Sequence, residues 1–205
     1  GADIVFIHGI SGGAFASWNQ EIIGKQAGNY TQFWPRLWVP SDLERRTKRS
    51  CRVLSVGYEA RPLRTLTEVE ATSSCSLDME EQAESLLKKL HLAHVGSDGR
   101  PVVFVCHSLG GLIVKKMLML AHESSSTKET NLGDIGQNTK AVVFYAVPHK
   151  GSPLMDILLQ PKDIAVASGV VVAHPIVKWL LTTHAPTIEL NKEFGRIYGN
   201  TALSI

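Results

Sequence analysis

Short, continuous runs of apolar residues recur along the chain, and glycine, proline or polar residues bound each of them. Four of these runs predict buried strands: Ile4–Ile7, Val53–Val56, Val102–Cys106 and Ala141–Val147. Runs this short, rich in valine and isoleucine and free of polar alternation, are typical of strands that are covered on both faces. The pattern therefore predicts a parallel sheet that is packed on both sides.

Stretches with helical periodicity separate these runs. A capping box at Asp78-x-x-Glu81 precedes an apolar stripe, and Gly96 follows it as a stop. The stripe consists of Met79, Ala83, Leu86, Leu87 and Leu90. Two more helices are expected, from Leu112 to Ala121 and from Thr187 to Tyr198. Strands that alternate with helices predict an α/β domain with right-handed crossovers.

Two segments lack a clear period. Residues Glu123–Asn138 are rich in serine, threonine and glycine, and they predict a long surface loop. Residues Leu154–Pro186 are irregular but rich in valine, alanine and leucine, and they follow the fourth strand. That second stretch has two open interpretations. It is a cap or lid inserted over the C-terminal edge of the sheet, or a plain crossover helix with a long connection.

The composition is that of a globular domain. The chain has 205 residues, of which 44% are hydrophobic and 20% are charged, and a chain of this size buries a core without disulfide staples. The net charge is only +2, and no basic run is interleaved with aromatic residues, so nucleic acid is not expected as a partner. No apolar run reaches the roughly 18 residues of a membrane span.

Metal and cofactor motifs are missing from the sequence. The three cysteines, Cys51, Cys75 and Cys106, have unrelated spacings, which indicate neither a zinc site nor a disulfide framework. The chain has no Walker loop, no GxGxxG and no HExxH, so phosphate, dinucleotide and zinc chemistry have no support. We therefore expect neither a cofactor nor a metal.

The strongest chemical signal is the run VCHSLGG at Val105–Gly111, which follows a predicted strand and opens a helix. In a nucleophile elbow, a serine on such a turn projects its Oγ above the sheet, and small residues two before and two after it allow close packing. Ser108 is the candidate nucleophile, with Cys106 and Gly110 at the small positions. The N–H of Leu109 would face a developing oxyanion, helped by the positive end of the helix. The alternative is a glycine-rich turn with a solvent-exposed serine.

A second signal is the run IHGISGG at Ile7–Gly13, which also follows a strand directly. Hydrolases of this type take a second oxyanion N–H from such a loop. Gly9 allows the backbone to approach closely, so the N–H of Ile10 is the candidate donor. His8 is expected to organise the loop through side-chain hydrogen bonds. Both oxyanion donors must meet over one site, which requires the first and third strands to be neighbours.

The elbow also implies the strand order of a hydrolase sheet. The strand near Val53 comes first, followed by those near Ile4, Val102 and Val142, with a strand from Ala202 at the far edge. The chain enters a strand almost at once and stops at the start of another, so both ends look cut. We therefore expect residues 1–205 to form a single, partial domain of a longer protein with other domains.

The acid and base that a catalytic serine needs are not identified. His149 follows the fourth strand, at the edge where ligands collect in α/β sheets, so it is expected near the site. In this fold the acid comes between the serine and the histidine. The carboxylates between Ser108 and His149 are Glu123, Glu129 and Asp134. All of them come too early in the sequence, and His174 and His184 fit the base position no better. The residues expected to support the site are His8, Gly9, His107, Gly110, Gly111 and His149.

Five pieces of the chain carry a family resemblance: Asp3–Trp18, Phe33–Leu43, Arg52–Ala60, Arg100–Leu118 and Val142–Ser152. They resemble, in order, the lipase-like α/β-hydrolases of the serine-active-site-containing protein family. The pieces WPRLWVPSDL, VKKML and FYAVPHKGS are more specific than the loop and the elbow. The resemblance implies an α/β-hydrolase fold, Ser108 as nucleophile and oxyanion donors at Ile10 and Leu109. It also implies a catalytic acid and histidine beyond Ile205.

Two functions of different classes follow from this resemblance. The family is associated with phospholipid acyl-chain remodelling, chiefly of phosphatidylglycerol, at mitochondrial and endoplasmic-reticulum membranes. It implies an intracellular serine hydrolase or acyltransferase that acts on a lipid ester and contacts a membrane peripherally. A related hydrolase-like domain begins some nucleotide-binding, repeat-carrying signalling proteins, and it implies the alternative of a non-catalytic interaction module. In either case residues 1–205 alone are expected to be a very poor catalyst.

Overall fold

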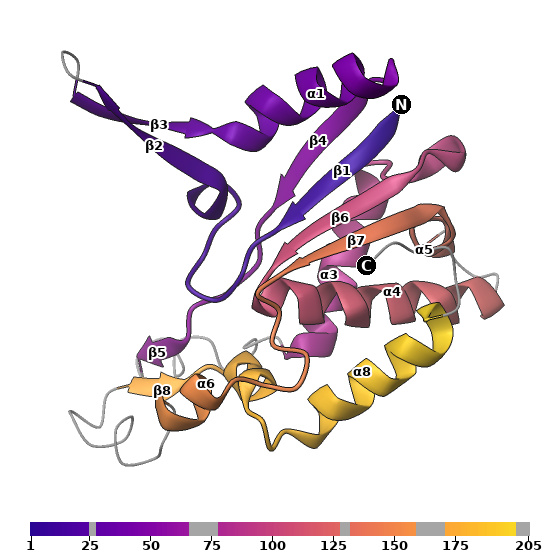
Figure 1. The fold of residues 1–205 in the computed structure, drawn as a ribbon. Coiled ribbons are helices and arrows are strands. Elements are labelled where there is room, and N and C mark those ends of the chain that lie inside the picture. The colour runs from indigo at the N-terminus through magenta and orange to yellow at the C-terminus, as the bar shows by residue number, and fades with distance from the viewer. Residues whose placement is uncertain (25–27, 66–77, 128–131, 159–170, 200–205) are drawn as a thin grey trace.

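The computed structural model describes the chain apart from residues 25–27, 66–77, 128–131, 159–170 and 200–205 (Figure 1). At its centre is a four-stranded parallel sheet, in the order β4 (Cys51–Val56), β1 (Ala2–Ile7), β6 (Val102–His107) and β7 (Thr139–Tyr145). This order confirms the predicted one, including the pairing of the first and third strands. The strand expected from Ala202 lies outside the described residues.

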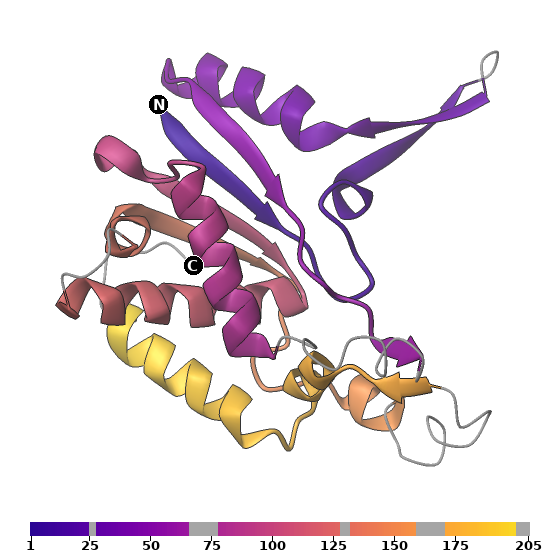
Figure 2. The same ribbon diagram turned by 180° about the vertical axis from the view of Figure 1, so that it is seen from behind.

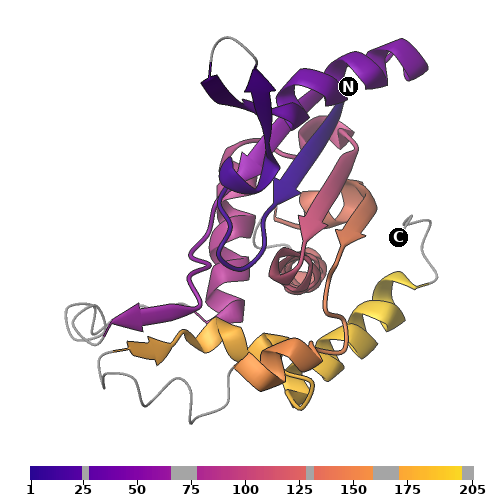
Figure 3. The same cartoon turned by 60° about the vertical axis from the view of Figure 1, so that its left-hand side comes forward.

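The sheet is packed on both faces. Four longer helices surround it: α1 (Trp34–Thr47), α3 (Met79–Leu92), α4 (Leu109–Thr127) and α8 (Ala185–Tyr198). Val5 and Ile7 of β1 are buried in the core shared with α3 and α4, and α8 packs on α4. Ile4 and Phe6 are buried in a second core on the side of α1. Figures 2 and 3 show α1 and α3 on opposite sides of the strands. Burial on both sides explains the continuous apolar run of β1, whereas Val143 and Tyr145 of β7 are exposed.

The start of α3 confirms the predicted capping box. The carboxylate of Asp78 accepts hydrogen bonds from the backbone N–H groups of Glu80 and Glu81, at 2.9 and 3.1 Å. The side chain of Glu81 accepts one in return from the Asp78 N–H, at 2.9 Å. These contacts satisfy donors that have no partner inside the helix.

An unexpected excursion joins β1 to α1. It comprises η1 (Ala16–Trp18) and an antiparallel hairpin of β2 (Asn19–Gly24) and β3 (Gly28–Phe33). Phe33 ends the hairpin and α1 begins one residue later, with Pro35 in its first turn, where a missing N–H costs nothing. The excursion brings Trp18 and Trp34 together, with ring centroids 6.2 Å apart, at the end of the sheet where β1 finishes.

The prediction of a surface loop over Glu123–Asn138 is wrong in the described residues. Helix α4 continues to Thr127, and a second helix, α5 (Gly133–Asn138), precedes β7. Tertiary packing stabilises α5, since Ile135 is fully buried and its carbonyl accepts a hydrogen bond from the Thr139 hydroxyl at 2.6 Å. The stretch is rich in weak helix formers, so its local propensity did not predict a helix that tertiary packing stabilises.

The described residues of the segment Leu154–Pro186 lie beyond the C-terminal ends of the strands (Figure 1). Its described elements are α6 (Pro153–Leu158), β8 (Val171–Ala173) and η3 (Pro175–Leu180), and β8 pairs with β5 (Leu63–Thr65). Ile176, Val177 and Leu180 of η3 are buried in the main core. The segment is therefore on the side of the sheet where a cap is expected. Its role as a lid stays a prediction.

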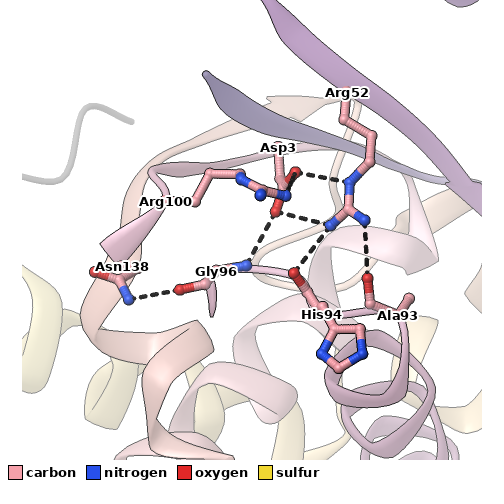
Figure 4. Close-up of polar contacts among 7 residues, drawn as sticks. All are labelled: Asp3, Arg52, Ala93, His94, Gly96, Arg100 and Asn138. Carbon is pink, nitrogen blue, oxygen red and sulfur yellow. Dashed lines mark hydrogen bonds and ion pairs between the residues drawn. The ribbon is translucent and has the colours of Figure 1, made fainter. Parts of the chain in front are cut away.

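A buried ion network anchors the opposite end of the sheet (Figure 4). Asp3, fully buried at the start of β1, accepts two hydrogen bonds from the Arg52 guanidinium at 2.9 and 3.1 Å, and a third from the Gly96 N–H at 3.0 Å. Arg100 lies 3.4 Å away, and η2 (Ser97–Gly99) begins just after Gly96. Arg52 also donates to the carbonyls that follow α3. The network joins β1, β4 and the α3–β6 connection.

Candidate active site

Ser108 lies on a strained turn between β6 and α4. Its φ is 50°, in the left-handed region that a residue with a Cβ rarely adopts. The turn is held at both ends, because the Ser108 N–H donates to the Tyr145 carbonyl at 2.9 Å and the Ser108 carbonyl accepts from the Gly111 N–H at 3.0 Å. A strand, a strained serine and a helix in immediate succession form the geometry of a nucleophile elbow.

Close packing of this turn requires small residues. A Cβ added to Gly110 would lie 2.3 Å from the carbonyl oxygen of His8, and one on Gly111 would lie 2.3 Å from Val147. Cys106 is fully buried in the main core, where it occupies the other small position of the elbow. These contacts are the physical reason for the small residues in VCHSLGG.

The loop after β1 lies directly against the elbow. A Cβ on Gly9 would be 2.8 Å from both the Ser108 Cβ and the His107 Nδ1. Since Ile7 is paired with Cys106 across the sheet, Ile10 and Leu109 each lie three residues beyond the same pair. In the part of the chain that the structure describes, neither backbone N–H has a hydrogen-bond acceptor. Both are free for an oxyanion.

His8 braces the loop, as its expected supporting role requires. The ring is buried, and its Nδ1 lies 2.9 Å from the Gly9 carbonyl, to which it donates. Its Nε2 accepts the N–H of Tyr58 at 3.3 Å, the tyrosine hydroxyl donates to the His8 carbonyl at 2.8 Å, and the two rings stack with centroids 4.4 Å apart. Burial lowers the pKa of His8, so the neutral ring makes these contacts. Sequence reasoning missed Tyr58, for which no motif gives a signal.

A pocket of about 630 Å³ opens beside the elbow. It is lined by Ile10, Ser11, Gly12, Ala16, Ser17, Trp18, Trp34, His107 and Tyr145. The loop after β1, the start of α1 and the ends of β6 and β7 supply these residues. Two tryptophans and a tyrosine give it apolar walls. Of the residues that the structure describes within Leu154–Pro186, none is among its lining residues.

His149 lies on the loop after β7, but its contacts are not those of a catalytic base. Its Nδ1 is 2.8 Å from the Nζ of Lys115, and its carbonyl accepts a hydrogen bond from Asn191. In the residues that the structure describes, no carboxylate bonds to His149. Burial and then the charge of Lys115 hold the pKa of His149 below its ordinary value.

The other titratable groups that sequence analysis weighed are not at the elbow. Glu123 lies 14 residues beyond Leu109, the first residue of α4, which is about 21 Å along the helix axis. Asp134 is in α5, before β7 starts, and Glu129 lies outside the described residues. His174 accepts the Ile176 N–H at the start of η3. His184 lies beside Thr187 at the start of α8.

Among the described residues, no group of three or more histidine, cysteine or acidic side chains has the arrangement of a metal site. Within the same residues, no helix combines the length and apolar character needed to cross a bilayer.

The parallel sheet, the helices on both faces and the serine turn after β6 define an α/β-hydrolase fold. Phospholipase PlaB from Legionella pneumophila matches 94% of this chain, and 35% of its own, with a TM-score of 0.51 at 16% identity. Its complex with thio-NAD gives a TM-score of 0.54 at 14% identity, over 94% of this chain and 33% of that one. Likeness at these identities shows the fold alone.

Protein SERAC1 of Bos taurus and of Homo sapiens is 36% identical to the chain over 166 residues, in each case. The match takes in 76% of this chain and 23% of each relative, so the chain spans about a quarter of the length of these curated relatives. This similarity confirms the family resemblance that the five sequence pieces carry. No family model matches the chain.

Proposed function

We propose that the chain carries the nucleophile and oxyanion donors of a serine-dependent lipid ester hydrolase or acyltransferase. The observation that carries the proposal is the strained backbone of Ser108, at φ 50°, between β6 and α4. Strain of this kind costs about 1–3 kcal/mol and persists only where the surroundings enforce it. The exposed Ser11 also has a positive φ, of 56°, but of these two serines only Ser108 stands directly between a strand and a helix.

In the proposed reaction, Ser108 Oγ attacks the carbonyl carbon of an ester while a base takes its proton. The carbonyl oxygen becomes an oxyanion and accepts hydrogen bonds from the Ile10 and Leu109 N–H groups. The positive end of α4 adds to this stabilisation. Removal of one such donor typically costs about 10²–10³-fold in turnover. The ester C–O bond then breaks, and the protonated base gives its proton to the departing oxygen, which leaves as the alcohol. Water or a second alcohol, deprotonated by the same base, then takes the acyl group from the serine.

The base and its acid are assigned to the rest of the full-length protein. The neighbours of Ser108 described here include neither, and a serine hydroxyl is a weak nucleophile without them. Residues 1–205 alone are therefore expected to turn over esters very slowly. Ser108-dependent turnover by this chain that matches the full-length protein would place a base within it, with His149 the first to mutate.

The lipid substrate is supported by the surroundings of the elbow. The adjacent pocket has aromatic walls, and large apolar side chains are exposed nearby: Phe15 is 64% exposed, and Leu37 and Trp38 are each 49% exposed. An acyl chain fits such a pocket, and exposed aromatic residues favour a membrane interface. Phosphatidylglycerol, which the family resemblance implies, is the first phospholipid to test.

The test is labelling of the full-length protein with a fluorophosphonate, which reacts with activated serines. The expected result is one labelled site that Ser108→Ala abolishes. Ser41→Ala, which removes an exposed hydroxyl on α1, is the matched control and should label normally. Persistent labelling of Ser108→Ala would assign the nucleophile elsewhere. No labelling and no turnover of phosphatidylglycerol vesicles would favour the alternative of an interaction module.

A further inference from the structure

The first turn of α4 is joined to the segment that follows β7. Ser108 contributes its N–H to the Tyr145 carbonyl at 2.9 Å. One turn later, Gly111 lies so close to Val147 that an added Cβ would be 2.3 Å from the valine Cγ2. Ser108 and Gly111 are three residues apart, and their partners Tyr145 and Val147 are two residues apart. The helix and the segment therefore run alongside each other from the elbow outwards.

Lys115 makes the third contact in this series. It is four residues beyond Gly111, on the same face of α4, and it is only 6% exposed. Its Nζ lies 2.8 Å from the Nδ1 of His149, two residues beyond Val147. A second hydrogen bond goes to the side-chain oxygen of Asn191 in α8. All three contacts therefore join one face of α4 to alternate residues of the same segment.

The surroundings of Lys115 are neutral and aromatic. The rings of Phe144 and Phe194 each lie with their centroids 5.1 Å from its Nζ, which is a cation–π distance. In the described part of the chain no carboxylate pairs with it. Burial lowers the pKa of Lys115 to about 8, so the ammonium form still predominates at pH 7. A buried ammonium without a counter-ion does little for stability, but its donors fix geometry.

Asn191 holds the same loop by a second route. Its side-chain N–H₂ group donates to the carbonyl of His149 and to the Thr187 carbonyl one turn earlier in α8. His149 is thus hydrogen-bonded at its ring by Lys115 and at its backbone carbonyl by Asn191. The loop that carries His149 therefore cannot move away from α4 and α8 without losing the hydrogen bonds from Lys115 and Asn191.

We propose that Lys115 is a positioning residue for Ser108: it locks the segment 145–149 against α4, and that segment carries the carbonyl that holds the Ser108 amide. The inference rests on the proposed role of Ser108 as nucleophile. The segment is itself strained, since Ala146 has a φ of 48°, next to the residue that bonds Ser108 at φ 50°. Strained backbone at Ala146 and Ser108 persists only where surrounding contacts hold it in place, and Lys115 provides such a contact.

The test substitutes Lys115→Met, which keeps an unbranched side chain, one atom shorter than that of lysine, and removes the N–H donors. In the full-length protein, the rate of Ser108 labelling by a fluorophosphonate is expected to fall about 10–100-fold, because small displacements of a reacting group are costly. The matched control is Lys116→Met. Lys116 is the next residue, and its Nζ pairs with the exposed Glu80 at 3.1 Å. The control should label within about twofold of the unchanged protein.

A second readout does not depend on Ser108 chemistry. NMR titration should show the pKa of His149 rising in Lys115→Met, because the neighbouring charge is lost while burial stays. Lys116→Met should leave the pKa of His149 unchanged. An unmoved titration in Lys115→Met would show that the charge of Lys115 does not act on His149, and that result would overturn the contact.

The outcomes separate the two proposals. No labelling of the unchanged protein would reject the nucleophile, while the His149 titration would still test the lock. Labelling of the unchanged protein with an equal rate in folded Lys115→Met would reject the positioning role. If that variant does not fold, His149→Phe replaces it, since it keeps a ring against Phe144 and removes the acceptor for Lys115. An undiminished rate in His149→Phe would likewise overturn the proposal.

Discussion

Gly9 and Ser108 are packed so closely that a Cβ on the glycine would lie 2.8 Å from the serine Cβ. Gly9→Ala must therefore push the loop after β1 away from the elbow, and with it the Ile10 N–H. We expect fluorophosphonate labelling of Ser108 in the full-length protein to slow by about 10²-fold, since an oxyanion donor is displaced.

Gly13→Ala is the control for this prediction. Gly13 lies in the same loop, but an added Cβ there would meet only the Ala16 Cβ, at an ordinary 3.8 Å. Its labelling rate should stay within about threefold of the unchanged protein. Equal rates in the Gly9 and Gly13 variants would show that the loop does not need to approach the serine closely.

Two glycine substitutions in helices should have opposite effects on stability. Gly110→Ala would place a Cβ 2.3 Å from the His8 carbonyl oxygen, so the free energy of unfolding should fall by about 2 kcal/mol or more. Gly195→Ala in α8 has nothing within 4 Å of its Cβ, so it should gain about 0.5–1 kcal/mol of helix propensity. Urea denaturation measures both. A stable Gly110→Ala variant would contradict the close approach of α4 to β1.

Asp3 should give the fold a pH-dependent contribution to stability. Burial by itself raises the pKa of Asp3, but the hydrogen bonds from Arg52 and Gly96 and the charges of Arg52 and Arg100 outweigh it and bring the pKa below its ordinary value. A carboxyl with a lowered folded-state pKa stabilises above its unfolded pKa, about 3.9, and this contribution disappears as pH falls through the folded-state pKa. The stabilisation is therefore complete at pH 7.

Asp3→Asn should lower the free energy of unfolding at pH 7 by about 3 kcal/mol, because it leaves Arg52 without its buried partner. The difference from the unchanged protein should begin to shrink as pH falls below about 4, and it should be lost once pH is below the lowered folded-state pKa of Asp3, where both lack the charge. Asp42→Asn is the control, since Asp42 pairs with Arg45 on the exposed side of α1. It should change stability by less than about 1 kcal/mol. Equal urea midpoints for both variants at pH 7 would refute the anchoring role.

Sequence periodicity predicted the position of β1 well because that strand is buried on both faces. Val5 and Phe6 point to different cores and both are apolar, so the apolar run of β1 is continuous and easily recognised in the sequence. Local chemistry also predicted the start of α3 at Asp78. Helix α5 could not be predicted in this way, because burial of Ile135 against distant elements, rather than propensity, makes it form. The surface loop expected there followed from local composition alone.

The elbow was predictable because its spacing has a steric cause that acts within a few residues. Lys115 was not, since a lysine in a helix is usually solvated, and its partners His149 and Asn191 come 34 and 76 residues later. One signal was available: Leu112–Ala121 is apolar on most faces, so a lysine inside it has to be buried or to reach past its neighbours. Gly111 comes three residues after Ser108, and Lys115 comes four residues after Gly111. This spacing places Lys115 on the face of α4 that continues from Ser108.

The rim of the pocket provides the last prediction, on membrane contact. Trp38 is 49% exposed, and its ring centroid lies 6.0 Å from that of Trp34, a pocket residue. Leu37 is equally exposed beside it, and Phe15, on the loop after β1, is also exposed and packs its ring against Phe33 at the end of β3. Arg36, next to Leu37, is exposed and available to an anionic headgroup. A side chain of this size gains about 1.5–3 kcal/mol when it leaves water.

Trp38→Ser in the full-length protein should therefore weaken binding to phosphatidylglycerol vesicles by about tenfold or more, measured by flotation, since 1.4 kcal/mol is a factor of ten. Turnover of a short soluble ester should stay within about twofold, because Trp38 is outside the pocket. Leu92→Ser is the matched control. Leu92 is 76% exposed but ends α3 beside the Asp3 network, at the other end of the sheet. Because the two variants remove comparable exposed apolar surface, equal losses of vesicle binding would mean that position does not matter. That result would reject the pocket rim as the membrane-facing side.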